Sequence, residues 1–600
     1  MWDVLPTTGI DDQPYVAVVA SDATQEHEGR GAIPDGPLGS PPYVYPTHLP
    51  NNAKIKAEVS LSNREDQVTV DLVITGATLH TLLARGAPAT AVAVADGTIA
   101  AVGDDADILA LAGPGTRRVD GRGLTVTPGL VDSHSHPFWG AEMTAGIDLT
   151  GVRDLSGLRE TLVAGCRDLP PDGWVQGWGL TYGVFADVGI SGGVFADAIA
   201  GRPAHLQFFD CHTGLASPRA LAIAGVTGPV EFPVASTIVC DADGPTGELR
   251  EPPAMDLVRR RIPELSDDAR YAIHVGGLRA LNAAGLTAVH GMDGDAETYA
   301  LLARLEDRGD LTVRMVTPLW QKPESTDAEM RADLALRDAG GRRWRGGAAK
   351  FFIDGVVETG TAWLVAPDSA GEGLLPYWPD PDRYAAAVKL FADAGFQCIT
   401  HAVGDRAVRA ALDAYATSGR PSRGRHRVEH IELLDPADLP RFAALGVAAS
   451  MQPLHMSEIR PSAGDPYTDR VGLGRVRGAF PTRDLKRSGA IVALGSDWPV
   501  APFDPRLGMA YALLRRGPGA PDREPVGPGQ ALTRTEVLEG YTVEPARMVG
   551  EEAVAGRIAP GYRADLTVFG ADPLTVDPDE LLALPITMTI VDGEIVHEAG

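Results

Sequence analysis

The most constraining feature of this sequence is a series of short apolar runs that end in a turn or a polar residue. Several runs are separated by segments with helical periodicity, such as residues 405–415, where Asp405 is expected to cap the helix. Apolar runs of this kind are typical of buried parallel strands. They cover residues 124–136, 285–290, 311–316, 348–354, 397–401, 426–431, 447–452 and 491–497.

Eight strand–helix repeats are what a TIM-type barrel requires. The predicted fold class is therefore α/β, with a (β/α)8 TIM-type barrel at its centre. In such barrels the functional residues lie at the C-terminal ends of the strands, so the polar residues that end each run are the first candidates for a site.

The first run contains a pair of histidines. We expect one buried strand over residues 124–132 that continues into His134 and His136. Residues two apart on a strand point to the same side, so the two imidazoles should project together. Imidazole is a common metal ligand, although two histidines in a surface loop would give the same pattern.

The later runs supply matching partners. Their ends carry Lys350 on the fourth strand, His401 on the fifth, His430 on the sixth and Asp497 on the eighth. An ordinary lysine would be costly to bury in the apolar surroundings of Lys350. The alternatives are a structural lysine, core histidines with satisfied hydrogen bonds, and an aspartate that caps a helix. Together with the histidine pair, these residues predict a metal site at the mouth of the barrel.

Short strands with Gly or Asp turns occur at both ends of the chain. Residues 68–125 and 548–600 share this pattern, which predicts one small β-sandwich domain built from both chain ends; two separate β-decorations are the alternative. The barrel is assigned to residues 126–547, with a large insertion after its first strand at about residues 141–270. Residues 1–67 are predicted to form an irregular N-terminal extension.

Charge and cysteine content narrow the class of function. The 600-residue chain has a formal net charge of −27, which argues against nucleic acid or an anionic membrane as a partner. Its four cysteines are widely spaced and lack a Cys-x-x-Cys pattern, so a disulfide framework or a zinc ribbon is not expected. The sequence also lacks a long apolar span and a signal-like N-terminus, and a cytoplasmic protein is therefore expected.

Five motifs stand at the candidate strand ends. They are Pro-Gly-Leu-Val-Asp-Ser-His-Ser-His-Pro at 128–137, Lys-Phe-Phe-Ile-Asp-Gly-Val-Val-Glu at 350–358, His-Ala-Val-Gly-Asp at 401–405, Val-Glu-His-Ile-Glu at 428–432 and Gly-Ser-Asp-Trp-Pro at 495–499. Together they resemble the amidohydrolase superfamily, and within it the family 3 branch that includes N-substituted formamide deformylases. The resemblance spans residues 68–600.

The resemblance implies a divalent metal cofactor, zinc as the first expectation, with one or two ions. The implied ligands are His134, His136, Lys350, His401, His430 and Asp497. The first two histidines would bind one ion and the last two a second. The resemblance also implies that Lys350 is N-carboxylated and bridges the ions, and that Asp497 is the proton shuttle.

The implied reaction is hydrolysis of a non-peptide C–N bond in a small amide, an N-substituted formamide or a related N-acyl amine, by metal-activated water. A cyclic-amide or ester hydrolase of the same superfamily and a metal-free scaffold protein on this fold are the alternatives. His212, Trp139 and Trp178 are the candidate substrate contacts, and a homodimer is expected. The branch's usual Glu-Ser-Arg-Thr-Ala reads Glu-Thr-Gly-Thr-Ala at 358–362. If that arginine contacts substrate in relatives, the group accepted here should differ.

Overall fold

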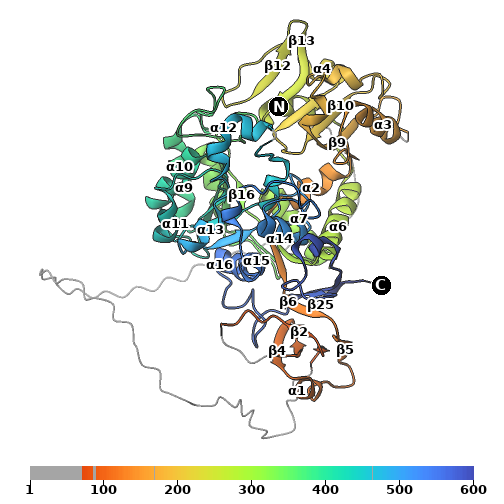
Figure 1. Cartoon of the computed structure of the whole chain (residues 1–600), viewed down its shortest axis with the longest axis vertical. Helices are drawn as coiled ribbons and strands as arrows, with labels where there is room; N and C mark the ends of the chain where they lie inside the picture. Colours follow the sequence, from red (N-terminus) through yellow and green to blue (C-terminus); the bar gives the residue numbers. More distant parts are fainter. Residues whose placement is uncertain (1–69, 85–88, 168, 463, 600) are drawn as a thin grey trace, which may run out of the picture. The chain divides into compact units, whose positions relative to one another are not determined.

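The computed structural model describes residues 70–84, 89–167, 169–462 and 464–599 (Figure 1). The predicted N-terminal extension, residues 1–67, lies outside the described residues. Within the described ranges, strands and helices alternate along most of the chain, which makes this an α/β protein. No described helix is long and apolar enough to cross a membrane.

Two sheets of parallel strands hold the centre of the described chain. The first has the order β17-β15-β14-β7 and the second the order β16-β18-β19-β20-β21-β22. Most of their residues are buried, as expected for parallel strands covered on both faces. The strands are β7 (Leu130–Ser135), β14 (Leu286–Gly291), β15 (Arg314–Val316), β16 (Leu319–Trp320), β17 (Trp344–Arg345), β18 (Ala348–Phe352), β19 (Gln397–Ala402), β20 (Arg427–His430), β21 (Ala448–Met451) and β22 (Val492–Leu494).

The two parallel sheets approach each other at both of their margins. At one margin, β15 leads into β16 and β17 leads into β18, and the register shifts by one residue between the pairs Met315–Trp344 and Leu319–Ala349. At the other margin, the Ser133 hydroxyl donates to the carbonyl of Leu494 at 2.6 Å. The ends of β7 and β22 therefore lie side by side.

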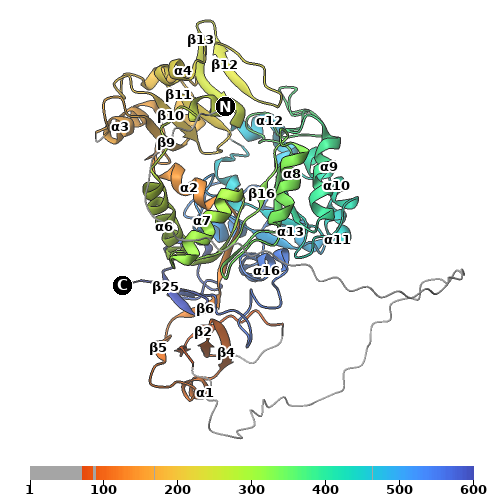
Figure 2. The same cartoon turned by 180° about the vertical axis from the view of Figure 1, so that it is seen from behind.

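Helices connect successive parallel strands, and α9, α10 and α11 lie next to one another on one flank (Figures 1 and 2). The predicted helix at residues 405–415 is α10, but its N-cap is Gly404, and Asp405 instead accepts a hydrogen bond from the Val365 amide at 2.8 Å. The capping role predicted for Asp405 is wrong. The connecting helices are α6 (Asp267–Ala283), α7 (Ala296–Asp307), α9 (Pro381–Asp393), α10 (Asp405–Ala416), α11 (Leu439–Leu445) and α13 (Thr482–Arg487).

The predicted strand over residues 124–132 is divided at Gly129. Its first part, β6 (Thr125–Pro128), pairs with β23 (Leu566–Phe569), whereas β7 pairs with β14. A Cβ atom at Gly129 would lie 2.2 Å from the Thr287 hydroxyl, so only glycine permits this close approach. The chain thus changes sheet at a residue without a side chain.

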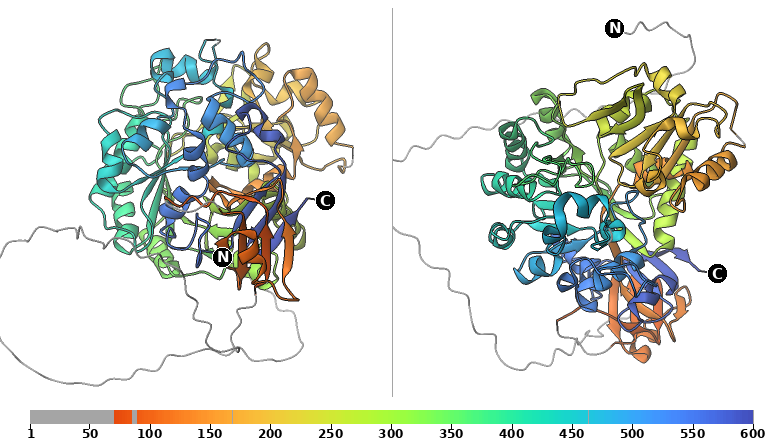
Figure 3. Two further views of the ribbon diagram at one scale, coloured as in Figure 1. Left: turned by 60° about the horizontal axis from the view of Figure 1, so that its bottom comes forward. Right: turned by 45° about the horizontal axis from the view of Figure 1, so that its top comes forward.

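Strands from both ends of the described chain pair with one another (Figure 3, left). One sheet has the order β4-β3-β1-β5 and another the order β2-β6-β23-β24-β25. Residues of both sheets, including Ile74, Val94, Val126 and Val568, share one apolar core. The remaining strands are β1 (Leu72–Thr75), β2 (Thr78–Leu79), β3 (Ala91–Ala95), β4 (Thr98–Gly103), β5 (Arg117–Asp120), β24 (Ile586–Val591) and β25 (Glu594–Glu598).

A further six-stranded sheet, β12-β13-β11-β10-β9-β8, lies between β7 and β14 in sequence. It has its own apolar cores, built around residues such as Leu206 and Leu249. Because the sheet follows directly after the histidine pair, its loops can reach the ends of the parallel strands. Its strands are β8 (Ile147–Asp148), β9 (Val175–Leu180), β10 (Ala204–Phe208), β11 (Thr213–Ala216), β12 (Thr237–Asp241) and β13 (Gly244–Arg250).

Candidate metal centre

Asp497, which follows β22, lies at the middle of a group of buried histidines. One carboxylate oxygen is 3.2 Å from Nε2 of His134 and 3.3 Å from Nε2 of His136. The other is 3.9 Å from Nδ1 of His430. One ligand atom from each of His134, His430 and Asp497 lies within 4.8 Å of the other two, a spacing that a single metal ion can span.

His401 and Lys350 complete the predicted set. The ring of His401, on β19, is 4.3 Å from that of His430 between centroids. Lys350 is 2% exposed on β18, next to β19, and its charge acts on both His134 and His401. All six residues singled out from the sequence are therefore gathered at the C-terminal ends of the parallel strands.

The backbone holds two of these residues in an unusual conformation. The φ angles of His430 and Asp497 are 73° and 62°, in the left-handed region that favours glycine. A non-glycine residue costs free energy there, and such residues cluster at functional sites. The conformation turns both side chains toward the histidine pair rather than along their strands.

Three of the candidate histidine ligands are poised to act as neutral ligands, whereas hydrogen bonds to Asp293 and Asp497 overcome the effect of burial and raise the pKa of His136 to about 9. Burial lowers the pKa of His134, and the charge of Lys350 lowers it further. The pKa values of His401 and His430 lie well below the ordinary value, mainly because of burial. Both ring nitrogens of His430 are buried, and neither has a hydrogen-bond partner among the described residues. Buried imidazole nitrogens beside a carboxylate fit a divalent cation.

Lys350 is equally unusual for its residue type. Burial lowers the pKa of its amine to about 8, against the opposing charges of Glu429 and Asp497. A substantial fraction of this lysine is thus neutral near physiological pH. A neutral amine is the form that can react with carbon dioxide.

A second layer of polar residues orients the histidine pair. Glu429 accepts a hydrogen bond from Nδ1 of His134, which directs Nε2 toward Asp497. Arg427 donates to Glu429 at 2.5 Å and lies 3.1 Å from Nδ1 of His290. These four residues form one buried chain of hydrogen bonds, running from His290 near the C-terminal end of β14 to the candidate metal centre.

Asp132 ties the first and last parallel strands together. Its carboxylate accepts from the amides of His134 at 3.1 Å and Ser496 at 2.9 Å, and from the Ser496 hydroxyl at 2.5 Å. Because these amides flank the candidate ligands, the Asp132 carboxylate fixes the spacing between His134 and Asp497.

Comparison with known proteins assigns the chain to a family. A model described as "Amidohydrolase family" matches residues 117–597, a range that contains every predicted ligand. The chain belongs to the amidohydrolase family.

Relatives of this amidohydrolase match along most of their length. The protein YtcJ of Bacillus subtilis is 28% identical over 542 residues, covering 87% of this chain and 98% of its own. N-substituted formamide deformylase of Arthrobacter pascens is 28% identical over 547 residues, covering 88% and 98%. The crystal structure of an uncharacterized metal-dependent hydrolase from Pyrococcus horikoshii superposes with a TM-score of 0.67 at 22% identity, covering 84% and 99%, and this likeness concerns the fold.

Two residues of the amidohydrolase site were missed from the sequence. His455 lies with Nε2 3.3 Å from Asp497 and Nδ1 3.1 Å from Glu432. Asp293 lies 3.2 Å from Nδ1 of His136. Both follow a predicted strand by three residues, so they fall just outside a search confined to strand ends. A wider window of polar residues after each strand would have found them.

A small cavity of about 40 Å³ opens beside the histidines of the amidohydrolase. His212 lines it, bonded to Glu251 at 2.8 Å, and its ring is 6.0 Å from that of His401. Trp139 lies 5.3 Å from His136 between ring centroids. Trp178 lies on β9 opposite Asp148 and is not among the described residues that line this cavity.

The position where the branch usually carries arginine is filled from another element. A Cβ atom at Gly360 would lie 2.3 Å from Nη1 of Arg470, on α12 (Pro466–Val476). Arg470 also donates to the carbonyl of Glu358 at 3.0 Å, and the Glu358 side chain lines the small cavity. The Arg470 guanidinium therefore occupies the space beside Gly360, where it pairs with Asp368 at 2.6 Å and with Glu372 at 2.7 Å.

Proposed function

We propose that the protein is a metal-dependent hydrolase that cleaves a non-peptide C–N bond of a small amide, an N-substituted formamide or a related N-acyl amine. The observation that carries this proposal is the group of buried, unpartnered imidazole nitrogens around the Asp497 carboxylate. The family assignment and the deformylase relative support it.

The proposed ligands are those expected from the sequence. His134 and His136 would hold one divalent ion, zinc in the first instance, and His401 and His430 would hold a second. Lys350 would be a further ligand once carboxylated, a reaction in which its neutral nitrogen attacks carbon dioxide and loses a proton. A bound divalent metal supplies Lewis acidity, which polarises a carbonyl and makes water nucleophilic near neutral pH.

The protein's own groups handle the protons and the substrate. Asp497 accepts the proton of the attacking water and delivers it to the departing nitrogen, which would otherwise be a poor leaving group. Binding sites for drug-sized molecules measure about 300–1,000 Å³, and the cavity beside the histidines measures about 40 Å³. A cavity of this size favours a formyl or similarly short acyl group. His212 and Trp139 are the proposed substrate contacts; Trp178 has less support.

The same proposal covers the architecture. The two parallel sheets are the two arcs of one (β/α)8 barrel, supported by the strand continuity at one margin and the β7–β22 contacts at the other. Residues 126–547 form the barrel domain, and residues 68–125 with 548–600 form the composite β-sandwich. A cytoplasmic homodimer is part of the proposal.

Metal analysis and a substrate screen test this function together. We expect about two zinc ions per chain, and hydrolysis of N-substituted formamides faster than that of longer N-acyl amines, lactams or esters. His134→Asn should lose metal and activity, whereas His597→Asn, on β25, should lose neither. Full activity in protein stripped of metal would refute the metal-dependent mechanism. Faster turnover of lactams or esters would favour the cyclic-amide or ester alternative.

A further inference from the structure

A cavity of about 570 Å³ lies at the opposite ends of the parallel strands from the metal centre. Its wall includes the first residues of β15 and β17, Arg314 and Trp344, whereas the proposed ligands other than Lys350 lie late in their strands or beyond them. Cavities that bind small molecules typically measure about 300–1,000 Å³. This cavity therefore has room for an organic ligand.

Arginines outnumber carboxylates in the wall of this cavity. Some of them are neutralised within the protein. Arg314 pairs with Asp565 at 2.6 Å and with Asp592 at 2.7 Å, and Arg343 pairs with Glu594 at 2.5 Å. These pairs join β15 and the neighbouring loop to the C-terminal strands, so we assign these two arginines a structural role.

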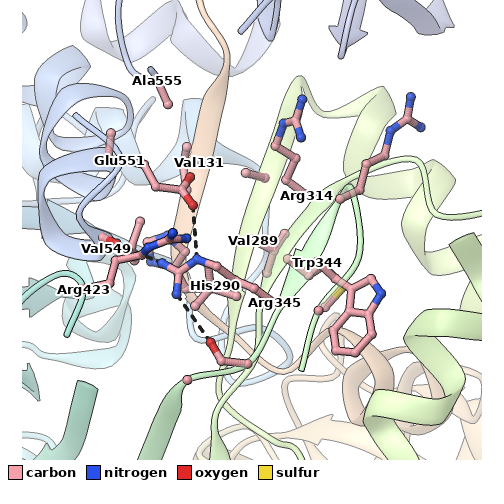
Figure 4. A pocket seen from close by; sticks show the side chains of 18 of the residues that line it. Val131, Val289, His290, Arg314, Trp344, Arg345, Arg423, Val549, Glu551 and Ala555 are labelled. Carbon is pink, nitrogen blue, oxygen red and sulfur yellow. Dashed lines mark hydrogen bonds and ion pairs between the residues drawn. The ribbon is translucent and has the colours of Figure 1, made fainter. Parts of the chain in front are cut away.

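The other wall carries surplus positive charge. Glu551 pairs with both Arg345, at 3.1 Å, and Arg563, at 2.6 Å. Arg423, an exposed residue beside Arg345 and Glu551, has no ion pair with any carboxylate of the described residues. Figure 4 shows Arg345, Arg423 and Glu551 together on one side of the cavity, with Arg314 and Trp344 on the other. Three guanidinium groups thus lie near one carboxylate, which pairs with only two of them.

The surplus charge affects the arginines themselves. Burial lowers the pKa of Arg345, and repulsion from Arg423 and Arg563 lowers it further, although Glu551 opposes both effects. The whole chain has a net charge of −27, so this wall is a positively charged region of a negatively charged protein. A positive wall inside a cavity raises the local concentration of anions.

We propose that this cavity binds a small polyanion carrying phosphate or carboxylate groups, held by Arg423 and Arg563. Arg345 adds positive charge beside them, while its own donors bond Glu551, Gly346 and Val549. The planar guanidinium fork pairs with either group through two parallel hydrogen bonds. An anion there would neutralise the charge that Glu551 leaves uncompensated. The site is separate from the proposed active site and does not depend on the proposed reaction.

Calorimetric titration of the metal-loaded protein at low ionic strength tests this site. The probes are inorganic phosphate, pyrophosphate and tricarballylate, a tricarboxylate. We expect at least one to bind, more weakly as sodium chloride is added. Arg423→Ala should weaken binding by about tenfold or more, because a charge-assisted hydrogen bond is lost. Arg420→Ala, an exposed arginine on the same loop outside the cavity, should leave binding unchanged.

Glu551→Gln tests the same site with a substitution that should strengthen anion binding rather than weaken it. Removing the carboxylate that Arg345 and Arg563 share should tighten binding, which a purely structural role would not produce. Preference for the phosphate probes or for tricarballylate identifies the anion class. Absence of binding by all three probes would overturn the proposal, as would equal affinities of the Arg423→Ala and Arg420→Ala variants, the result expected if anions bind only at the metal. If Glu551→Gln does not fold, the comparison of the two arginine variants still decides.

Discussion

Asp497 is the carboxylate that most residues of the candidate metal centre contact. Burial alone would raise its pKa, but His134, His136 and His455 bring the value well below the ordinary range. The group is therefore ionised before the reaction begins, as a proton acceptor must be. Its left-handed backbone places it where an aspartate on a regular strand would not reach.

Asp497→Asn preserves the size of the side chain but removes its ability to accept a proton. General acid–base catalysis typically contributes about 10²–10⁴-fold, so kcat should fall by at least about 100-fold. Metal content should fall much less because the histidines remain. Steady-state kinetics and elemental analysis measure both quantities. Glu458→Gln, which changes an exposed carboxylate, is the control. If Asp497→Asn retains a tenth of wild-type kcat, the proton transfer belongs to another group.

The pKa of Lys350 predicts how the centre assembles. Its amine has a pKa of about 8, lowered by burial from 10.5, so it is mostly protonated below pH 8 and mostly neutral above it. Only the neutral form reacts with carbon dioxide. When zinc is added to metal-free protein at a fixed concentration of dissolved carbon dioxide, recovery of activity should quicken as pH rises from 6 to 8 and then level off. Lys389→Ala, which removes an exposed lysine, should behave like wild type. A rate of recovery that does not depend on the concentration of carbon dioxide would contradict carboxylation of Lys350.

At the scale of elements, β7 shows what the sequence could and could not predict. Its apolar run and the alternation of His134 and His136 are local patterns, and they predicted a buried strand that contains His134 and is followed by His136, as the structure has it. The division at Gly129 depends on Thr287 in the neighbouring strand, which no local pattern reveals. His455 lies outside a search confined to strand ends, because it follows its strand on a short 3₁₀ helix (Pro453–Glu458) that brings it back to Asp497.

Gly129→Ala tests the close contact between β7 and β14. The added methyl group would collide with the Thr287 side chain, and overpacking of a buried site typically costs about 1–3 kcal/mol. The free energy of unfolding in urea should fall by that amount. Gly276→Ala, at an open position in α6, is the matched control and should stabilise the protein by up to about 1 kcal/mol. Equal effects of the two substitutions would show that the strands separate without cost.

At the scale of the whole molecule, the strands of the chain ends are bonded to the parallel sheets. The Thr567 hydroxyl, on β23, accepts from the Leu130 amide at 3.1 Å and donates to the Gly285 carbonyl at 2.7 Å. Leu130 begins β7 and Gly285 precedes β14, so one buried side chain joins the C-terminal strands to two parallel strands. The sequence indicated that both chain ends carry short strands, but side-chain bonds across 437 residues have no local signature.

Thr567→Val removes these bonds while keeping the shape of the side chain. It leaves a buried amide and a buried carbonyl without partners, at about 1–3 kcal/mol for each unsatisfied group. The free energy of unfolding should therefore fall by about 2 kcal/mol or more. Thr575→Val, at an exposed position, should change it little. If Thr567→Val leaves the free energy of unfolding unchanged, water or a backbone shift must satisfy both the Leu130 amide and the Gly285 carbonyl.

The bond between Asp132 and Ser496 spans 364 residues. A ribosome that adds about 5–20 residues per second needs roughly 20–70 s to travel that distance. Throughout this interval the nascent chain presents His134 and His136 without the carboxylate that completes their site. The proposed metal centre can therefore be completed only after the last parallel strand has been synthesised.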